Sequence, residues 1–101
     1  MASGGNRVTM NFNGFTFDEH PKREGVDAMW RCQISPGVRV SLFKRRIGWN
    51  VLVSVIVGRG TVRTQCEASS LDSAWDEAIA QLRIISPLAA DVWDESCEVY
   101  K

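Results

Sequence analysis

The chain has 101 residues, of which 45% are hydrophobic and 24% are charged. This length predicts a single domain, and the composition is that of an ordinary globular protein. No apolar run approaches the roughly 18 residues that a membrane-spanning helix needs, and the first six residues lack the basic and apolar segments of a secretory signal. The sequence therefore argues against a multidomain enzyme, a membrane protein and a secreted disulfide scaffold.

In chain order, we expect residues 1–6 to form a flexible lead and residues 7–101 a single α+β domain. Residues 7–17 alternate between apolar and polar, with Asn13-Gly14 among them. They predict either one strand with a bulge at Gly14 or a small hairpin, because Asn-Gly is a strong signal for a tight turn. Residues 18–27 are charged and contain Pro and Gly, so we expect an exposed loop there.

Four alternating segments follow, at residues 28–34, 38–46, 49–57 and 61–66. Their period of two and their β-branched residues indicate strands. Short turns with Pro or Gly separate several of them. Consecutive strands with short connections predict an antiparallel β-meander, here of four to five strands.

The period changes after residue 69. From Leu71 to Ile85 apolar residues recur at steps of three and four, which predicts a long amphipathic helix with Ser69 or Ser70 as its cap. Ser86-Pro87 ends this helix and starts a short second one that should reach about Ser96. The predicted fold class is α+β, with the long C-terminal helix packed on one face of the sheet.

The strand period assigns side chains to the two faces of the sheet. The helix should cover the face with Trp30, Cys32, Ile34, Val38, Val40, Leu42, Val51, Val53, Val55, Val62 and Cys66. The other face should carry Arg31, Gln33, Arg39, Ser41, Phe43, Arg45, Leu52, Ser54, Ile56, Arg63 and Gln65.

The second face combines arginines with exposed apolar residues, and this combination usually marks a contact site. It fits a protein interface, in which Arg and aromatic residues are enriched. It also fits a nucleic-acid surface, although a single aromatic residue is few for base stacking. A third interpretation is that residues 7–17 or the C-terminal helix cover this face. The candidate contact residues are Arg31, Arg39, Phe43, Arg45 and Arg63.

The charge distribution is uneven, although the formal net charge is zero. Residues 1–66 contain ten Lys and Arg against four Asp and Glu, whereas residues 67–101 contain two against eight. This asymmetry indicates a charged partner or two halves that pair within the fold. Acids on the predicted helices form either a solvated surface or a negative surface that mimics nucleic acid. They are Asp72, Asp76, Glu77, Asp91, Asp94, Glu95 and Glu98.

The run Lys44-Arg45-Arg46 has two interpretations of its own. It could contact a phosphate or an acidic partner, because adjacent cations concentrate positive potential. The simpler interpretation is a solvated strand end that protects the sheet from aggregation. Three cations are fewer than the basic runs that serve as nucleic-acid signals, which favours the simpler interpretation.

The sequence offers little catalytic chemistry. His20 is the only histidine, and a metal site on Asp18, Glu19 and His20 is a weaker interpretation than a solvated loop. The three cysteines lack metal-ligand spacing, and their odd number favours reduced thiols in a cytoplasmic protein. No phosphate-binding glycine loop or catalytic triad is recognisable. We therefore expect no enzyme activity, no metal and no cofactor.

Small size, a β-meander followed by the Ser70–Ile85 helix, and segregated charge occur together in this chain. In this combination it resembles the small proteins that bacteriophages and mobile elements encode to block host defences, anti-CRISPR proteins included. The resemblance concerns the style of the whole fold and transfers no individual residue. It implies a non-catalytic inhibitor or adaptor that occupies a nucleic-acid or subunit site of a defence complex.

The residues themselves favour a protein partner, with a nucleic-acid-binding module as the alternative. The oligomeric state stays open between a monomer and a homodimer. A homodimer would pair through an edge strand or through the open face of the sheet. Either arrangement would hide part of the exposed apolar surface.

Overall fold

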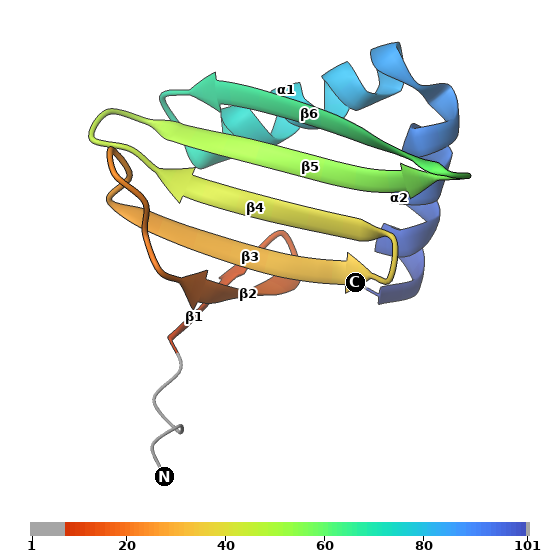
Figure 1. The fold of residues 1–101 in the computed structure, drawn as a ribbon. Helices are drawn as coiled ribbons and strands as arrows, with labels where there is room; N and C mark the ends of the chain where they lie inside the picture. Colours follow the sequence, from red (N-terminus) through yellow and green to blue (C-terminus); the bar gives the residue numbers. More distant parts are fainter. Residues whose placement is uncertain (1–7, 101) are drawn as a thin grey trace, which may run out of the picture.

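The computed structural model describes residues 8–100, so the lead expected at residues 1–6 lies outside the described part of the chain. It shows an antiparallel sheet of six strands, whose order across the sheet is their order in the chain, with two helices on one face (Figure 1). The predicted α+β class and the antiparallel meander are therefore confirmed. The elements are β1 (Thr9–Phe12), β2 (Phe15–His20), β3 (Ala28–Ser35), β4 (Val38–Lys44), β5 (Trp49–Val57), β6 (Gly60–Ala68), α1 (Leu71–Ile85) and α2 (Pro87–Tyr100).

The sheet has six strands rather than the four to five predicted, because its first segment is a hairpin of two strands. Asn13 and Gly14 form the two-residue turn, with φ values of 52° and 84°. Positive φ at both positions is what a type I′ turn requires, and Asn followed by Gly adopts it readily. The Asn-Gly pair thus decides between the two interpretations that the alternation left open.

The face predicted to be covered is the one against which the helices pack. Its central side chains in β4 and β5 are completely buried, as the two-residue period requires. Phe15 and Phe17 of the first hairpin also point into this core. The hairpin therefore enlarges the core and leaves the other face of the sheet uncovered. The completely buried valine and leucine side chains of β4 and β5 are Val38, Val40, Leu42, Val51, Val53 and Val55.

Helix α1 begins at the predicted cap, because the Ser70 side chain accepts a hydrogen bond from the Ser73 backbone N–H at 3.2 Å. Its apolar stripe packs on β5 and β6. The Thr64 hydroxyl in β6 donates a hydrogen bond to the Ala78 carbonyl at 2.9 Å, so this buried polar group is satisfied. Trp75 is the largest side chain of the stripe and is 7% exposed.

Helix α2 was predicted to be short, but it continues past Ser96 to Tyr100 and is nearly as long as α1. Its N-terminus is capped by Ser86, whose side chain accepts a hydrogen bond from the Ala89 N–H at 3.2 Å. The helix extends because its inner side still packs on β3 at Ser96. There the Ser96 hydroxyl forms a hydrogen bond with the Ser35 hydroxyl of β3 at 3.0 Å.

The outer surfaces of the two helices are joined by a bidentate pair between the Arg83 guanidinium and the Asp94 carboxylate, with N–O distances of 2.8 and 2.7 Å. These hydrogen bonds lower the pKa of Asp94 below its ordinary value of 3.8. The two side chains are 49% and 51% exposed, so solvent weakens the pair. Its contribution to stability should be about 0.2–1 kcal/mol.

We expect Asp94→Asn to lower the free energy of unfolding by about 0.2–1 kcal/mol at neutral pH. A carboxyl group with a depressed pKa in the folded state stabilises the fold above its unfolded-state pKa. This stabilisation is lost as the pH falls through the folded-state value. Denaturant titrations should therefore show wild type and variant converging below about pH 4. Glu95→Gln on the same helix is the control, and a difference for Asp94→Asn that persisted in acid would point to packing instead of charge.

Candidate interaction face

The face of the sheet opposite the helices is open, as Figure 1 shows with the strands in front and the helices behind. The strand register places its side chains in rows that cross the sheet, in agreement with the predicted alternation. Across β3, β4, β5 and β6, one row is Gln33, Arg39, Ser54 and Arg63, and the adjacent row is Arg31, Ser41, Leu52 and Gln65.

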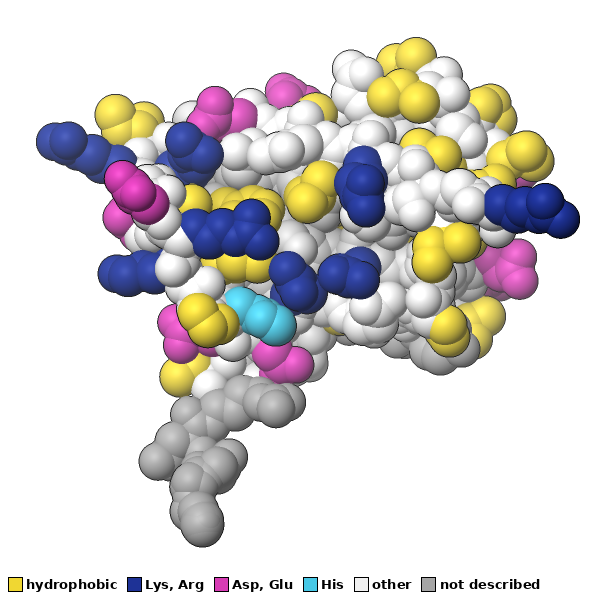
Figure 2. All heavy atoms as spheres, in the orientation of Figure 1, with side chains coloured by type: hydrophobic (Ala, Val, Ile, Leu, Met, Phe, Trp, Pro, Cys, Tyr) yellow, Lys and Arg dark blue, Asp and Glu magenta, His cyan; other side chains and the backbone are white. Residues whose placement is uncertain are grey.

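Three of the predicted contact residues, Arg31, Arg39 and Arg63, line a shallow hollow of about 200 Å³ on this face. Arg39 and Arg63 are the two cross-strand neighbours of Ser54. Their Cα atoms are therefore separated by two strand spacings, roughly 10 Å. In Figure 2, Lys and Arg side chains gather across the middle of this face and the acidic side chains lie around its margin. We call the hollow that Arg31, Arg39 and Arg63 line the arginine hollow.

The arginine hollow also has apolar walls. Leu52 and Ile56 of β5 line it, and Ile56 is 52% exposed. Aliphatic groups between guanidinium groups suit a surface that buries both kinds of group against a partner. The hollow therefore combines a preference for negatively charged groups with an apolar surface that a partner could bury.

Arg31 adds an unsatisfied donor to the hollow. Its Nε is buried and has no hydrogen-bond partner within residues 8–100. An unpaired buried donor costs about 1–3 kcal/mol, and more when it is charged. A reorientation of the guanidinium that paired Nε with a carboxylate or phosphate oxygen would remove this penalty. The arrangement thus favours an anionic group as the occupant.

The other end of the open face is partly covered by the loop at residues 21–27. Sequence analysis predicted an exposed loop over residues 18–27, but residues 18–20 belong to β2, which pairs with β3. The Asp27 N–H donates a hydrogen bond to the carbonyl of the last β4 residue at 2.8 Å, which fixes the loop to the sheet. Val26 and Phe43 line a second hollow there. Met29 is 3% exposed, although it is the cross-strand neighbour of Phe43 on the open face. The signals that sequence analysis missed were an apolar Val26 in a charged loop and an apolar Met29 on the strand face that otherwise carries Arg31 and Gln33.

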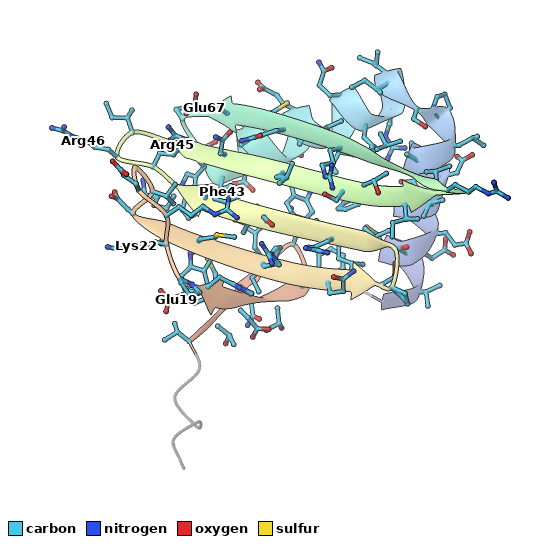
Figure 3. The ribbon with its side chains drawn as sticks, viewed as in Figure 1. Glu19, Lys22, Phe43, Arg45, Arg46 and Glu67 are labelled. Atoms are coloured by element: carbon cyan, nitrogen blue, oxygen red, sulfur yellow. The ribbon has the colours of Figure 1, made fainter. Side chains whose placement is uncertain are left out.

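The basic run Lys44-Arg45-Arg46, which begins at the last residue of β4, does not act as one cluster. Arg45 lies in the turn after β4 rather than in a strand, and its Nε is 3.7 Å from Oε2 of Glu67 (Figure 3). The Nζ of Lys44 is 5.4 Å from the ring centre of Trp49. Arg46 extends beyond the end of the sheet (Figure 3). Arg45 lines the second hollow with Phe43 and not the arginine hollow. The three basic side chains thus diverge, which favours a solvated strand end over a single basic site.

The acidic candidates belong to the helix layer, behind the sheet. All of them are exposed, but they do not form a single free surface, because Asp94 is bound by Arg83. The fold therefore converts the charge asymmetry of the sequence into a basic sheet face and an acidic helix layer. The exposed acids are Asp72, Asp76 and Glu77 on α1 and Asp91, Asp94, Glu95 and Glu98 on α2.

The cysteine side chains contribute to packing and are not set up as nucleophiles. Burial raises the pKa of the Cys32 and Cys66 thiols, with smaller contributions from nearby carboxylates. A raised pKa disfavours the nucleophilic thiolate at neutral pH. In the part of the chain that the structure describes, no three His, Cys, Asp or Glu side chains lie close enough together to hold a metal ion.

No protein-family model matches the chain, and no curated protein or solved structure resembles it significantly. Among residues 8–100, no helix is both long enough and apolar enough to cross a membrane. The evidence for function therefore comes from the geometry and charge of the open face.

Proposed function

We propose that this protein is a non-catalytic inhibitor or adaptor that binds an acidic surface of a protein partner through the arginine hollow. The observation that carries this proposal is a hollow lined by three arginines, one of which, Arg31, has a buried Nε without a hydrogen-bond partner among residues 8–100. Carboxylates of a partner would satisfy these donors, since Arg forms strong bidentate pairs with them. The protein would act by occluding a subunit site on its target, as the resembled host-defence inhibitors do, and we place it in the cytoplasm.

The composition of the hollow favours a protein over a nucleic acid. Leu52 and Ile56 would be buried by a protein surface, and interface centres typically combine such groups with Arg. Base stacking needs exposed aromatic rings, but Phe43 is half-buried at the end of the face that the 21–27 loop covers. A nucleic acid stays the second candidate because the spacing of Arg39 and Arg63 across β5 also suits phosphate contacts.

The test uses the full chain as bait in a bacterial lysate, with and without nuclease. The double substitution Arg31→Glu with Arg39→Glu should weaken retention of the partner at least about 30-fold, because central interface arginines often contribute 2 kcal/mol or more. Arg59→Glu is the matched control, because Arg59 is exposed in the β5–β6 turn and does not line the hollow. A partner protein that survives nuclease and is lost only with the double variant supports the proposal.

Two other results would contradict the proposal. Retention that is equal for wild type and the double variant would mean that the hollow is not the binding site. Retention that disappears with nuclease would favour the nucleic-acid candidate. In that case affinity for a labelled oligonucleotide, measured by fluorescence anisotropy, should fall with salt at a slope of about −0.9 per phosphate contact on duplex DNA.

A further inference from the structure

The sheet ends in a long strand that is open on one side. Strand β6 pairs with β5 along its whole length without a bulge, and no strand within residues 8–100 pairs with its other side. The opposite edge of the sheet, β1, has only four residues. Native proteins usually protect an edge with Pro, a bulge, shortness or charged side chains, and of these the nine residues of β6 contain only the charges of Arg63 and Glu67.

The hairpin before β6 determines which main-chain groups face outward. Val57 and Gly60 close a two-residue turn, so they form the hydrogen-bonded pair next to it. Hydrogen-bonded and non-hydrogen-bonded pairs alternate along an antiparallel ladder. The N–H and C=O groups of Arg63, Gln65 and Glu67 therefore point away from β5 and are available to another strand.

The side chains of these three residues also lie on the open face, and their charges depend on register. If a second copy of β6 pairs antiparallel about an axis at Gln65, Arg63 of each copy lies directly opposite Glu67 of the other. An axis at Thr64 would place Arg63 opposite Gln65, and an axis at Arg63 would place two arginines opposite each other. Opposite charges in directly paired positions stabilise a sheet, and like charges destabilise it.

From this pattern we propose that two copies of the chain pair antiparallel through β6, with the two-fold axis at Gln65. On the helix side of the sheet, this register places Thr64 opposite Cys66 and Val62 opposite Ala68, so small or apolar groups meet there. The dimer joins the two sheets, and their open faces form one continuous basic surface. The inference does not depend on the proposed function, because it rests on the free main-chain groups and charge register of β6, although Arg63 also lines the arginine hollow.

Two neighbouring charges bear on this pairing. Glu67 already interacts with Arg45 through Oε2 at 3.7 Å, but a carboxylate has a second oxygen that can accept from Arg63 of the other copy. Glu77 of α1 lies near Cys66, where it adds to the effect of burial in raising the pKa of the thiol, so one carboxylate of each copy approaches the axis. Glu77 is exposed, and salt at physiological strength screens this repulsion.

A charge exchange tests the register. Sedimentation velocity of the full chain should show a dimer of twice the 11.3 kDa chain mass. Arg63→Glu alone, or Glu67→Arg alone, places like charges opposite each other and should weaken dimerisation at least about tenfold. The double variant restores opposite charges in each pair and should recover the dimer. Arg39→Glu is the matched control, because Arg39 lies on the same face but away from the edge.

A proline substitution tests the strand edge itself. Gln65→Pro removes an N–H that points outward, so it should give a monomer whose melting temperature stays close to that of wild type. Thr64→Pro removes an N–H that bonds to β5 and should destabilise the fold. A monomeric wild type at micromolar concentration would overturn the proposal. So would a dimer that persists in both single charge variants, because that dimer would use another surface.

Discussion

Trp75→Ala should lower the free energy of unfolding by about 3–5 kcal/mol, which is the usual effect of removing a buried large aromatic side chain. The Trp75 ring joins parts of the chain that are distant in sequence. Its centre lies 5.3 Å from the ring of Phe12 and 6.3 Å from those of Phe15 and Phe17. The ring of Trp93 in α2 lies 5.6 Å away. The substitution therefore weakens the contacts of α1 with the first hairpin and with α2 together.

Thermal unfolding followed by circular dichroism would measure this loss. For a domain of this size, each kcal/mol shifts the melting temperature by about 4–8 °C, so a decrease of at least about 12 °C is expected. Ile84→Ala is the matched control, because Ile84 lies in the same helix and is 74% exposed. It should change stability by less than about 0.5 kcal/mol. Equal melting temperatures for wild type and Trp75→Ala would contradict the aromatic cluster.

Gly48→Ala should destabilise the fold by about 3 kcal/mol or more, because two effects add at this position. Gly48 has a φ of 87°, a backbone conformation that side chains disfavour. A Cβ there would also lie 2.5 Å from the carbonyl oxygen of Ala68 and 3.3 Å from its carbonyl carbon. Both contacts are with backbone at the end of β6, which cannot move away as a flexible side chain could.

Gly25→Ala separates the two effects. Gly25 has a similar φ of 82°, but an added Cβ would meet no atom within 4 Å. We expect this variant to lose only about 1–2 kcal/mol, the cost of the left-handed conformation. Urea titrations of both variants would give the difference, which is the cost of the steric contact. If the two variants were equally stable, the close approach of Gly48 to Ala68 would be wrong.

Local sequence pattern predicted most of this fold because both periods are strong. The alternation of residues 49–57 and the three-and-four spacing of residues 71–85 each leave one arrangement that buries the apolar side chains. Consecutive strands with short connections then leave few topologies other than a meander. The structure confirms the resulting assignment of Val51, Val53 and Val55 to the core and of Arg31 and Arg39 to the open face.

Other features depend on contacts between distant segments, and local pattern does not determine these. The extra length of α2 depends on a surface at Ser35 of β3, which lies far from Ser96 in the sequence. The position of the 21–27 loop depends on the end of β4. The register across β5 decides that Arg39 and Arg63 share one neighbour, because a shift by two residues would preserve the faces and separate the arginines.

The order of the strands along the sheet has a consequence for how the chain folds during synthesis. Every strand pairs only with its neighbours in sequence, so the ribosome releases a complete sheet before either helix has emerged. At about 5–20 residues per second, the apolar face of the early strands stays without the helices for seconds. The half-made chain is then the species most prone to aggregate. Synonymous codons that slow translation beyond Ala68 should lower the yield of folded protein without changing its final stability.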